Sequence, residues 1–87
     1  SKRATFYLLC KEDDEKCKTL LENVETAKRE MGSDIEVKAV SDPSEFTAFG
    51  ITTEQTPAVV EGRYELRSAR VVPETAAIKE WIKNVTR

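Results

Sequence analysis

The chain contains no histidine, and this absence excludes more chemistry than any other feature of the composition. Without an imidazole there can be no Ser-His-Asp or Cys-His nucleophile pair and no His-ligated metal site. Two cysteines alone cannot complete a four-thiolate zinc or iron–sulfur site within one chain. Thiol chemistry, carboxylate chemistry or no chemistry remains, and we expect neither a metal nor a cofactor.

Long apolar runs and an excess of positive charge are missing as well. No apolar run approaches the roughly 20 residues that cross a membrane, and a net charge of −2 provides no basic surface for a nucleic acid. The chain begins at Ser1 without an initiator methionine or a signal-like apolar segment, which suggests a trimmed or excised domain and favours a cytoplasmic location. We therefore expect no membrane or nucleic-acid partner, and the oligomeric state stays open.

The composition that is present is typical of a small globular protein. Of 87 residues, 39% are apolar and 34% are charged, which is too apolar for a disordered chain. A chain of this length buries only about two-thirds of its unfolded surface. We expect one domain, spanning residues 1–87.

The N-terminal third combines a strand, an acidic loop and a helix. Residues 4–10 are apolar or β-prone at nearly every position, as in a strand that is covered on both faces. An amphipathic helix follows, which Gly32 would end, and its apolar stripe consists of Cys17, Leu20, Leu21, Val24, Ala27 and Met31. The carboxylates of residues 12–15 between them suit a helix N-terminus, where they cap free N–H groups. A divalent-cation site is the alternative for this acidic run.

The remaining residues supply the partners of that unit. Residues 35–40 predict a second strand, so the first two strands and their helix form a right-handed βαβ crossover. A short helix is expected from Asp42, which can cap it, to Gly50. Residues 58–60 and 64–68 predict a β-hairpin, and a last helix follows Pro73.

The resulting order, β-α-β-α-β-β-α, with helices on both faces of a four-stranded mixed sheet, resembles the thioredoxin fold in its glutaredoxin-sized form. More narrowly, the chain looks like the small thioredoxin-like "redox-active disulfide" proteins. This resemblance spans nearly all of the chain, and it is carried by Lys16-Cys17-Lys18 with Leu20, Leu21 and Asn23-Val24, by Gly50-Ile51, by Thr56-Pro57-Ala58 and by Arg70-Val71-Val72-Pro73 with Ile78-Lys79-Glu80-Trp81.

The resemblance also assigns roles to particular residues. Such proteins carry Cys-x-x-Cys after the first strand, with an exposed attacking thiol first and a more buried resolving thiol second, and a cis-proline packs against the pair. Cys17 matches the second cysteine, and Thr56-Pro57 matches the cis-proline position. Asp14 stands where the first cysteine is expected, so the usual attacking group is missing, and Cys10 lies four residues upstream of it.

The two cysteines admit two interpretations. The short loop between Cys10 and Cys17 could bring their Cα atoms within the roughly 4.4–6.8 Å that a disulfide requires. Alternatively, both thiols are small core residues, since free cysteine is often buried. A helix N-terminus favours the thiolate of Cys17, whereas burial and four nearby carboxylates disfavour it. Cys17 is therefore expected to be a slow nucleophile unless Lys16 or Lys18 offsets those charges.

Two functions follow from these interpretations. The first is thiol–disulfide exchange with a partner protein or a thiol or disulfide substrate, through Cys17 with Cys10 as its partner and Pro57 shaping the substrate groove. The second is a non-catalytic thioredoxin-fold domain that binds a partner through the loop of residues 11–16 and the Thr56-Pro57 turn. The sequence does not decide between them, so whether the protein is an enzyme stays open.

Overall fold

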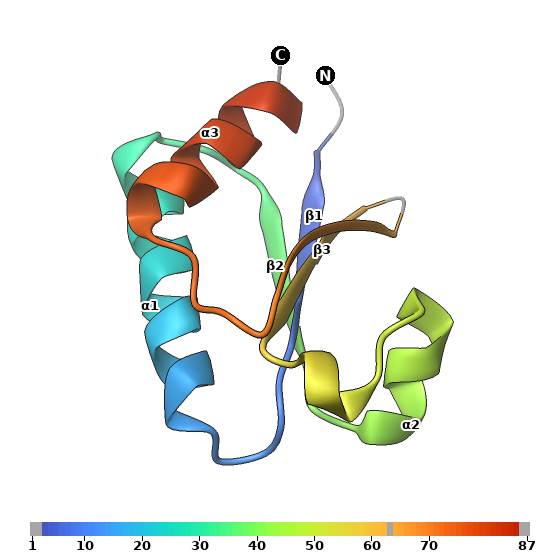
Figure 1. Ribbon diagram of the computed structural model, residues 1–87. Coiled ribbons are helices and arrows are strands. Elements are labelled where there is room, and N and C mark those ends of the chain that lie inside the picture. The colour runs from blue at the N-terminus through green and yellow to red at the C-terminus, as the bar shows by residue number, and fades with distance from the viewer. Residues whose placement is uncertain (1–2, 63, 86–87) are drawn as a thin grey trace.

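The computed structural model describes residues 3–62 and 64–85, and the order of its elements is the expected one (Figure 1). In chain order the elements are β1 (Thr5–Leu9), α1 (Glu15–Glu30), β2 (Glu36–Val40), α2 (Pro43–Phe46), the short 3-10 helices η1 (Thr47–Phe49) and η2 (Thr53–Gln55), β3 (Ala58–Glu61), β4 (Glu65–Ala69) and α3 (Thr75–Val85). The β-α-β-α-β-β-α prediction is thus confirmed, with two 3-10 turns that the sequence pattern did not separate.

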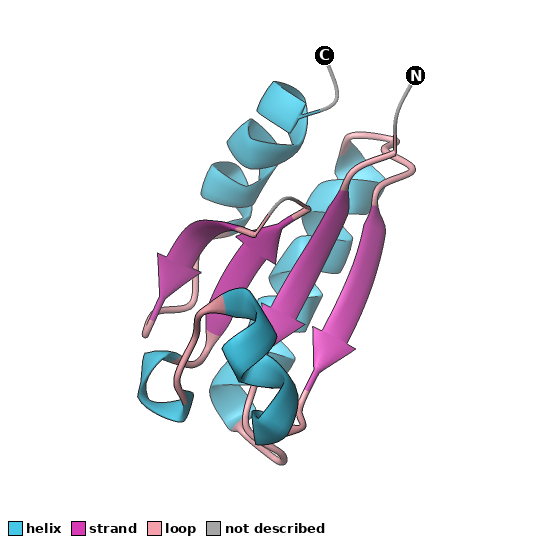
Figure 2. Cartoon of the chain, turned by 90° about the vertical axis from the view of Figure 1, so that its right-hand side faces the viewer, coloured by secondary structure: helices cyan, strands magenta, loops and turns pink. Residues whose placement is uncertain are grey.

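The strands form one mixed sheet in the order β2-β1-β3-β4 (Figure 2). β1 pairs in parallel with β2 and antiparallel with β3, and β3 pairs antiparallel with β4. The register places Leu9, the last residue of β1, beside Val40 of β2 and Ala58 of β3. The end of β1, the end of β2 and the start of β3 therefore lie side by side at one end of the sheet.

Side chains of β1 alternate between two apolar layers. Phe6 and Leu8 pack into a cluster with residues of α1 and α3, whereas Leu9 packs with Phe46 and Ile51 on the opposite face. Figure 1 shows α1 and α3 together on one side of the sheet and α2 on the other. The thioredoxin-like arrangement, with helices on both faces, is confirmed.

Helix α1 begins and ends as its sequence predicts. The Asp14 carboxylate accepts a hydrogen bond from the backbone N–H of Lys16 (2.9 Å), so it caps the N-terminus. At the other end Gly32 adopts a left-handed conformation (φ 57°), which glycine reaches without steric cost.

The apolar stripe of α1 is wider than the face that the sheet covers. Leu20 is fully buried, but the adjacent Leu21 is 41% exposed and Met31 is 37% exposed. The expectation that all six stripe residues face the core is therefore wrong for these two. For Leu21 the reason is the position of β2 at the edge of the sheet, because within residues 3–62 and 64–85 no further strand lies beyond β2 to cover this flank of the helix.

The short helix after Asp42 also follows its sequence signals. The Asp42 carboxylate accepts hydrogen bonds from the backbone N–H (3.0 Å) and hydroxyl (2.8 Å) of Ser44, and these bonds lower the pKa of Asp42. The segment is one α-helical turn followed by a 3-10 turn, and it ends at Gly50 (φ 71°). Ile51 then packs back against Phe46, as expected for an apolar residue after a left-handed cap.

Contacts along its length hold α3 against α1. The Asn23 side-chain amide donates a hydrogen bond to the Pro73 carbonyl (3.0 Å) just before α3 begins, and Lys79 pairs with Glu30 near the other end of α1. The hydrogen bond and the charge of Lys79 lower the pKa of Glu30. In the range 3–62 and 64–85, no helix is long and apolar enough to span a bilayer.

The two adjacent leucines of α1 provide a matched test of this packing. Leu20→Ala should lower the free energy of unfolding by about 3 kcal/mol, because it leaves a cavity in the core. Leu21→Ala should cost less than about 1 kcal/mol, because its side chain is partly solvated and alanine favours the helix. Urea unfolding followed by circular dichroism measures both. Equal costs for the two variants would contradict the placement of α1 on the sheet.

Candidate functional site

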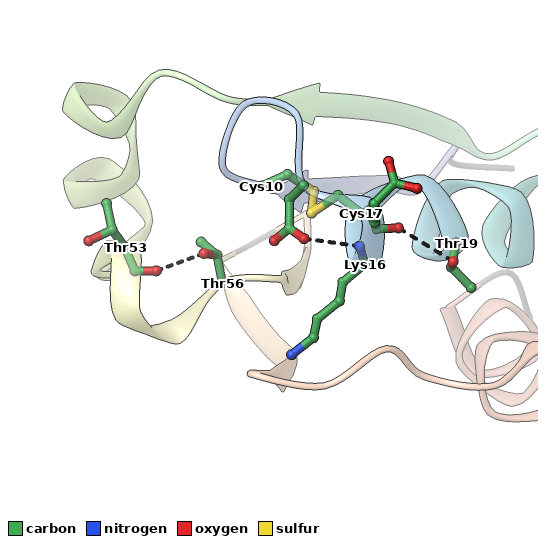
Figure 3. The surroundings of a disulfide bond; sticks show 8 residues. Cys10, Lys16, Cys17, Thr19, Thr53 and Thr56 are labelled. Atoms are coloured by element: carbon green, nitrogen blue, oxygen red, sulfur yellow. Dashed lines mark hydrogen bonds between the residues drawn. A yellow bond between two sulfur atoms is a disulfide. The ribbon is translucent and has the colours of Figure 1, made fainter.

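A disulfide joins Cys10 to Cys17 at the junction of β1 and α1 (Figure 3). The Cα atoms of the two cysteines are 5.9 Å apart, within the range that disulfides occupy. Cys10 directly follows β1, and Cys17 lies in the first turn of α1. Of the two interpretations that the sequence left open, pairing of the cysteines is the one found.

The two sulfur-bearing residues differ in exposure. Cys10 is 9% exposed and belongs to the core cluster beneath α1, and its backbone N–H donates to the Val40 carbonyl (2.9 Å). Cys17 is only half-buried and packs at the margin of that cluster. Cys17 is thus less buried than its place on the apolar stripe predicts, because it lies one turn before Leu20, the first fully buried residue of α1. Cys17 is therefore the more exposed residue of the pair, although both cysteines line the same groove.

Both the side-chain carboxylate and the backbone carbonyl of Asp14 accept hydrogen bonds at the start of α1. Its carboxylate accepts from the Lys16 N–H, and its backbone carbonyl accepts from the N–H of Cys17 (3.0 Å) and of Lys18 (3.3 Å). The bonds from Lys16 and Cys17 satisfy two of the N–H groups that a helix N-terminus leaves without an intrahelical partner. The residue at the position of the missing cysteine thus has a structural role, and it adds a carboxylate beside the disulfide.

Neither lysine of this turn brings its charge to the disulfide. The Lys16 side chain extends away from it in Figure 3. The Lys18 ammonium pairs with the carboxylate of Glu15 (2.7 Å). The condition under which lysine would offset the carboxylates, and so favour a thiolate at Cys17, is not met by these side-chain positions.

Pro57 lies at the same end of the sheet as the disulfide. Because Leu9 pairs with Ala58 in antiparallel β1 and β3, the residues next to them, Cys10 and Pro57, are neighbours across these strands. The Thr56–Pro57 peptide bond is cis, and Pro57 is buried. The backbone N–H of Arg70 holds this turn by donating to the carbonyls of Pro57 (3.0 Å) and Gln55 (2.9 Å).

Thr56 does not reach toward the disulfide. Its hydroxyl donates a hydrogen bond to the Thr53 carbonyl (2.6 Å), within the turn of η2 (Figure 3). The structure thus brings Cys10, Cys17, Asp14 and the Thr56-Pro57 turn to one end of the molecule. A role for Thr56 and Pro57 in binding a substrate stays a prediction.

A groove of about 260 Å³ opens onto the disulfide from the side of β2. It is lined by Leu8, Cys10, Lys11, Glu12, Asp13, Asp14, Cys17, Lys18, Leu21, Ala39 and Ser41, and Thr56 and Pro57 are not among these residues. Sequence reasoning missed Leu21, Ala39 and Ser41 as parts of the site. The only sequence signal for any of these three residues is that Leu21 lies at the border of the apolar stripe of α1.

The acidic loop is not arranged as a metal site. Across residues 3–62 and 64–85, no group of three or more Cys, Asp or Glu side chains is placed so that it could hold a metal ion. The cation-binding alternative for residues 12–15 therefore gains no support, whereas capping of α1 by Asp14 is observed.

A mixed four-stranded sheet between two helical layers, with a disulfide where its first strand meets its first helix, defines a thioredoxin-fold protein. The family model of the thioredoxin domain matches residues 10–83, which include both cysteines and Pro57. The chain therefore belongs to the thioredoxin-domain family. No curated protein sequence matches it significantly.

The disulfide should contribute measurably to stability. Closing the short loop between residues 10 and 17 removes conformational entropy from the unfolded chain, which corresponds to about 2.5 kcal/mol. Urea unfolding with and without a dithiol reductant should show a loss of this size. The double variant Cys10→Ser/Cys17→Ser should unfold identically in both conditions, and an unchanged wild-type midpoint on reduction would refute the cross-link.

Proposed function

We propose that the protein carries out thiol–disulfide exchange through the Cys10–Cys17 pair. The observation that carries this proposal is a disulfide with one accessible and one buried cysteine, located at the strand–helix junction of a thioredoxin-family chain. A disulfide with a purely structural role does not need an open groove beside it. Thiol–disulfide exchange does, because a thiolate has to reach one of the sulfur atoms. No cofactor is needed, because the electrons are carried by the sulfur atoms.

The exposure of the two cysteines sets the direction of the steps. A substrate thiolate attacks the Cys17 sulfur, forms a mixed disulfide there and expels Cys10 as a thiolate. A second substrate thiolate then attacks the substrate sulfur of the mixed disulfide and releases Cys17, so a dithiol is oxidised and the protein disulfide is reduced. In the opposite direction the Cys17 thiolate attacks a substrate disulfide, and Cys10 resolves the mixed disulfide. The protein is returned to its starting state by any dithiol or disulfide of suitable potential.

This order reverses the family pattern. Cys17 matches the position of the usual resolving cysteine, yet it is the more exposed of the pair here, and the resolving role passes to Cys10 just after the strand. Pro57 is proposed to support this end of the sheet, because the pairing of β1 with β3 places it beside Cys10.

A non-catalytic partner-binding domain is the second candidate. The observation that favours it is Asp14, which replaces the usual attacking cysteine and puts a carboxylate beside Cys17, while neither Lys16 nor Lys18 compensates for its charge. Negative charge near the sulfur disfavours the thiolate and slows exchange. The loop of residues 11–16 would then act as a recognition surface with the disulfide as its brace.

Single-cysteine variants distinguish the two candidates. After reduction and removal of the reductant, Cys10→Ser should form a mixed disulfide with neutral hydroxyethyl disulfide at least about tenfold faster than Cys17→Ser does, because the remaining thiol is the accessible one. Mass spectrometry after acid quench measures both rates. The reduced wild type should pass through the same adduct and return to the internal disulfide, releasing two mercaptoethanol molecules.

Circular dichroism of both variants serves as the folding control for this comparison. Faster reaction of Cys17→Ser would refute the assignment of the attacked sulfur. If the reduced wild type forms no adduct and does not recover its internal disulfide, exchange is refuted and the binding domain remains.

A further inference from the structure

We infer that the groove beside the disulfide selects a polypeptide segment in which the reacting cysteine is flanked by a basic residue and an apolar one. The inference rests on the proposed exchange at Cys17 and specifies its substrate class. It depends on three features of the groove, namely its position at the free edge of the sheet, its charge and its apolar wall.

The groove is accessible because β2 is the outermost strand. Ala39 and Ser41 come from the end of this strand and its continuation, and Cys17, Lys18 and Leu21 come from the facing turns of α1. Ala39 is exposed although it pairs beside the buried Leu8. A chain approaching along β2 therefore meets the accessible Cys17 without displacing any element of the fold.

The charges around the groove are unbalanced. Its lining carries the carboxylates of Glu12, Asp13 and Asp14 and the ammonium groups of Lys11 and Lys18. The carboxylate of Glu15 already pairs with Lys18, and Lys16, the third lysine of this segment, points away from the disulfide (Figure 3). Outside that ion pair, the lining residues carry three negative charges and one positive charge, so a basic residue beside the attacking sulfur is attracted and an acidic one is repelled.

The wall of the groove adds an apolar requirement. Leu21 is the largest apolar side chain of α1 left exposed near the disulfide, at 41%, and it lies with Leu8 and Ala39 in the lining. A volume of about 260 Å³ is below the roughly 300–1,000 Å³ of typical small-molecule pockets. It suits one or two side chains of a peptide, so the selected residues are those next to the reacting cysteine.

Matched peptide thiols test this selectivity on the oxidised protein. The probes are acetyl-Lys-Cys-Leu-amide, acetyl-Glu-Cys-Leu-amide and acetyl-Lys-Cys-Gly-amide. Each rate of protein reduction is divided by the rate of the same peptide with hydroxyethyl disulfide, which removes differences in intrinsic thiol reactivity. The normalised Lys-Cys-Leu rate should exceed that of Glu-Cys-Leu by about fivefold to tenfold in low salt. This ratio should fall toward one in about 0.5 M salt, where charges are screened beyond a few ångströms.

Variants locate the effect in the groove. Glu12→Gln/Asp13→Asn should remove most of the charge preference, and asparagine tolerates the left-handed backbone of Asp13 (φ 61°). Glu25→Gln/Glu80→Gln is the control, because it changes the net charge equally at exposed residues outside the groove lining. Leu21→Ala should lower the Lys-Cys-Leu rate to that of Lys-Cys-Gly.

The outcomes separate the inference from the function on which it rests. Reaction of all three peptides at equal normalised rates, or a preference that the control variant removes as well, overturns the inference and leaves exchange intact. If no peptide reduces the protein although the reduced wild type reacts with hydroxyethyl disulfide, the inference is overturned. If that reaction with hydroxyethyl disulfide fails as well, exchange itself is overturned.

Discussion

Strand β1 pairs with a neighbour along each of its edges and packs against apolar side chains on each of its faces. Its position is therefore fixed from four sides, and the chain can leave the sheet only at the end of the strand. Cys10 stands at that exit, held by a backbone hydrogen bond to Val40 and placed beside Pro57 by the register. The first turn of α1 has to return over the same end of the sheet, which brings Cys17 within disulfide distance.

The disulfide fastens a loop whose side chains are engaged in starting a helix. Asp14 satisfies the first N–H groups of α1 through its carboxylate and its carbonyl, so the position of the usual attacking cysteine is used for capping. With its partner cysteine moved upstream to the end of the strand and into the core, Cys17 in the helix is the more exposed member of the pair. In the proposed exchange, the greater exposure of Cys17, rather than the order in the sequence, assigns the attacked sulfur. The residues of the acidic loop also give the groove its negative charge.

The edge position of β2 has consequences for both stability and recognition. A strand beyond β2 would cover Ala39 and the flank of α1 that carries Leu21, and it would close the groove. Without that strand, a leucine that looks like a core residue from its spacing is left at the surface beside the disulfide. Leu20 and Leu21 therefore serve different purposes although they are adjacent and identical in type.

Much of the fold was determined by the sequence itself, because local signals and periodicity are read over short distances. Asp14, Gly32, Asp42 and Gly50 mark helix boundaries through their own backbone and side-chain chemistry, and the apolar run of β1 predicts a strand that is buried on both faces. The missing histidine and the replaced cysteine limited the chemistry in the same direct way. Only the tertiary structure decided that Cys10 and Cys17 pair, which of them is accessible and which flank of α1 is uncovered. These properties depend on the order of the strands and on how far the sheet extends under a helix. Such contacts between residues far apart in the chain do not show in the periodicity of the sequence.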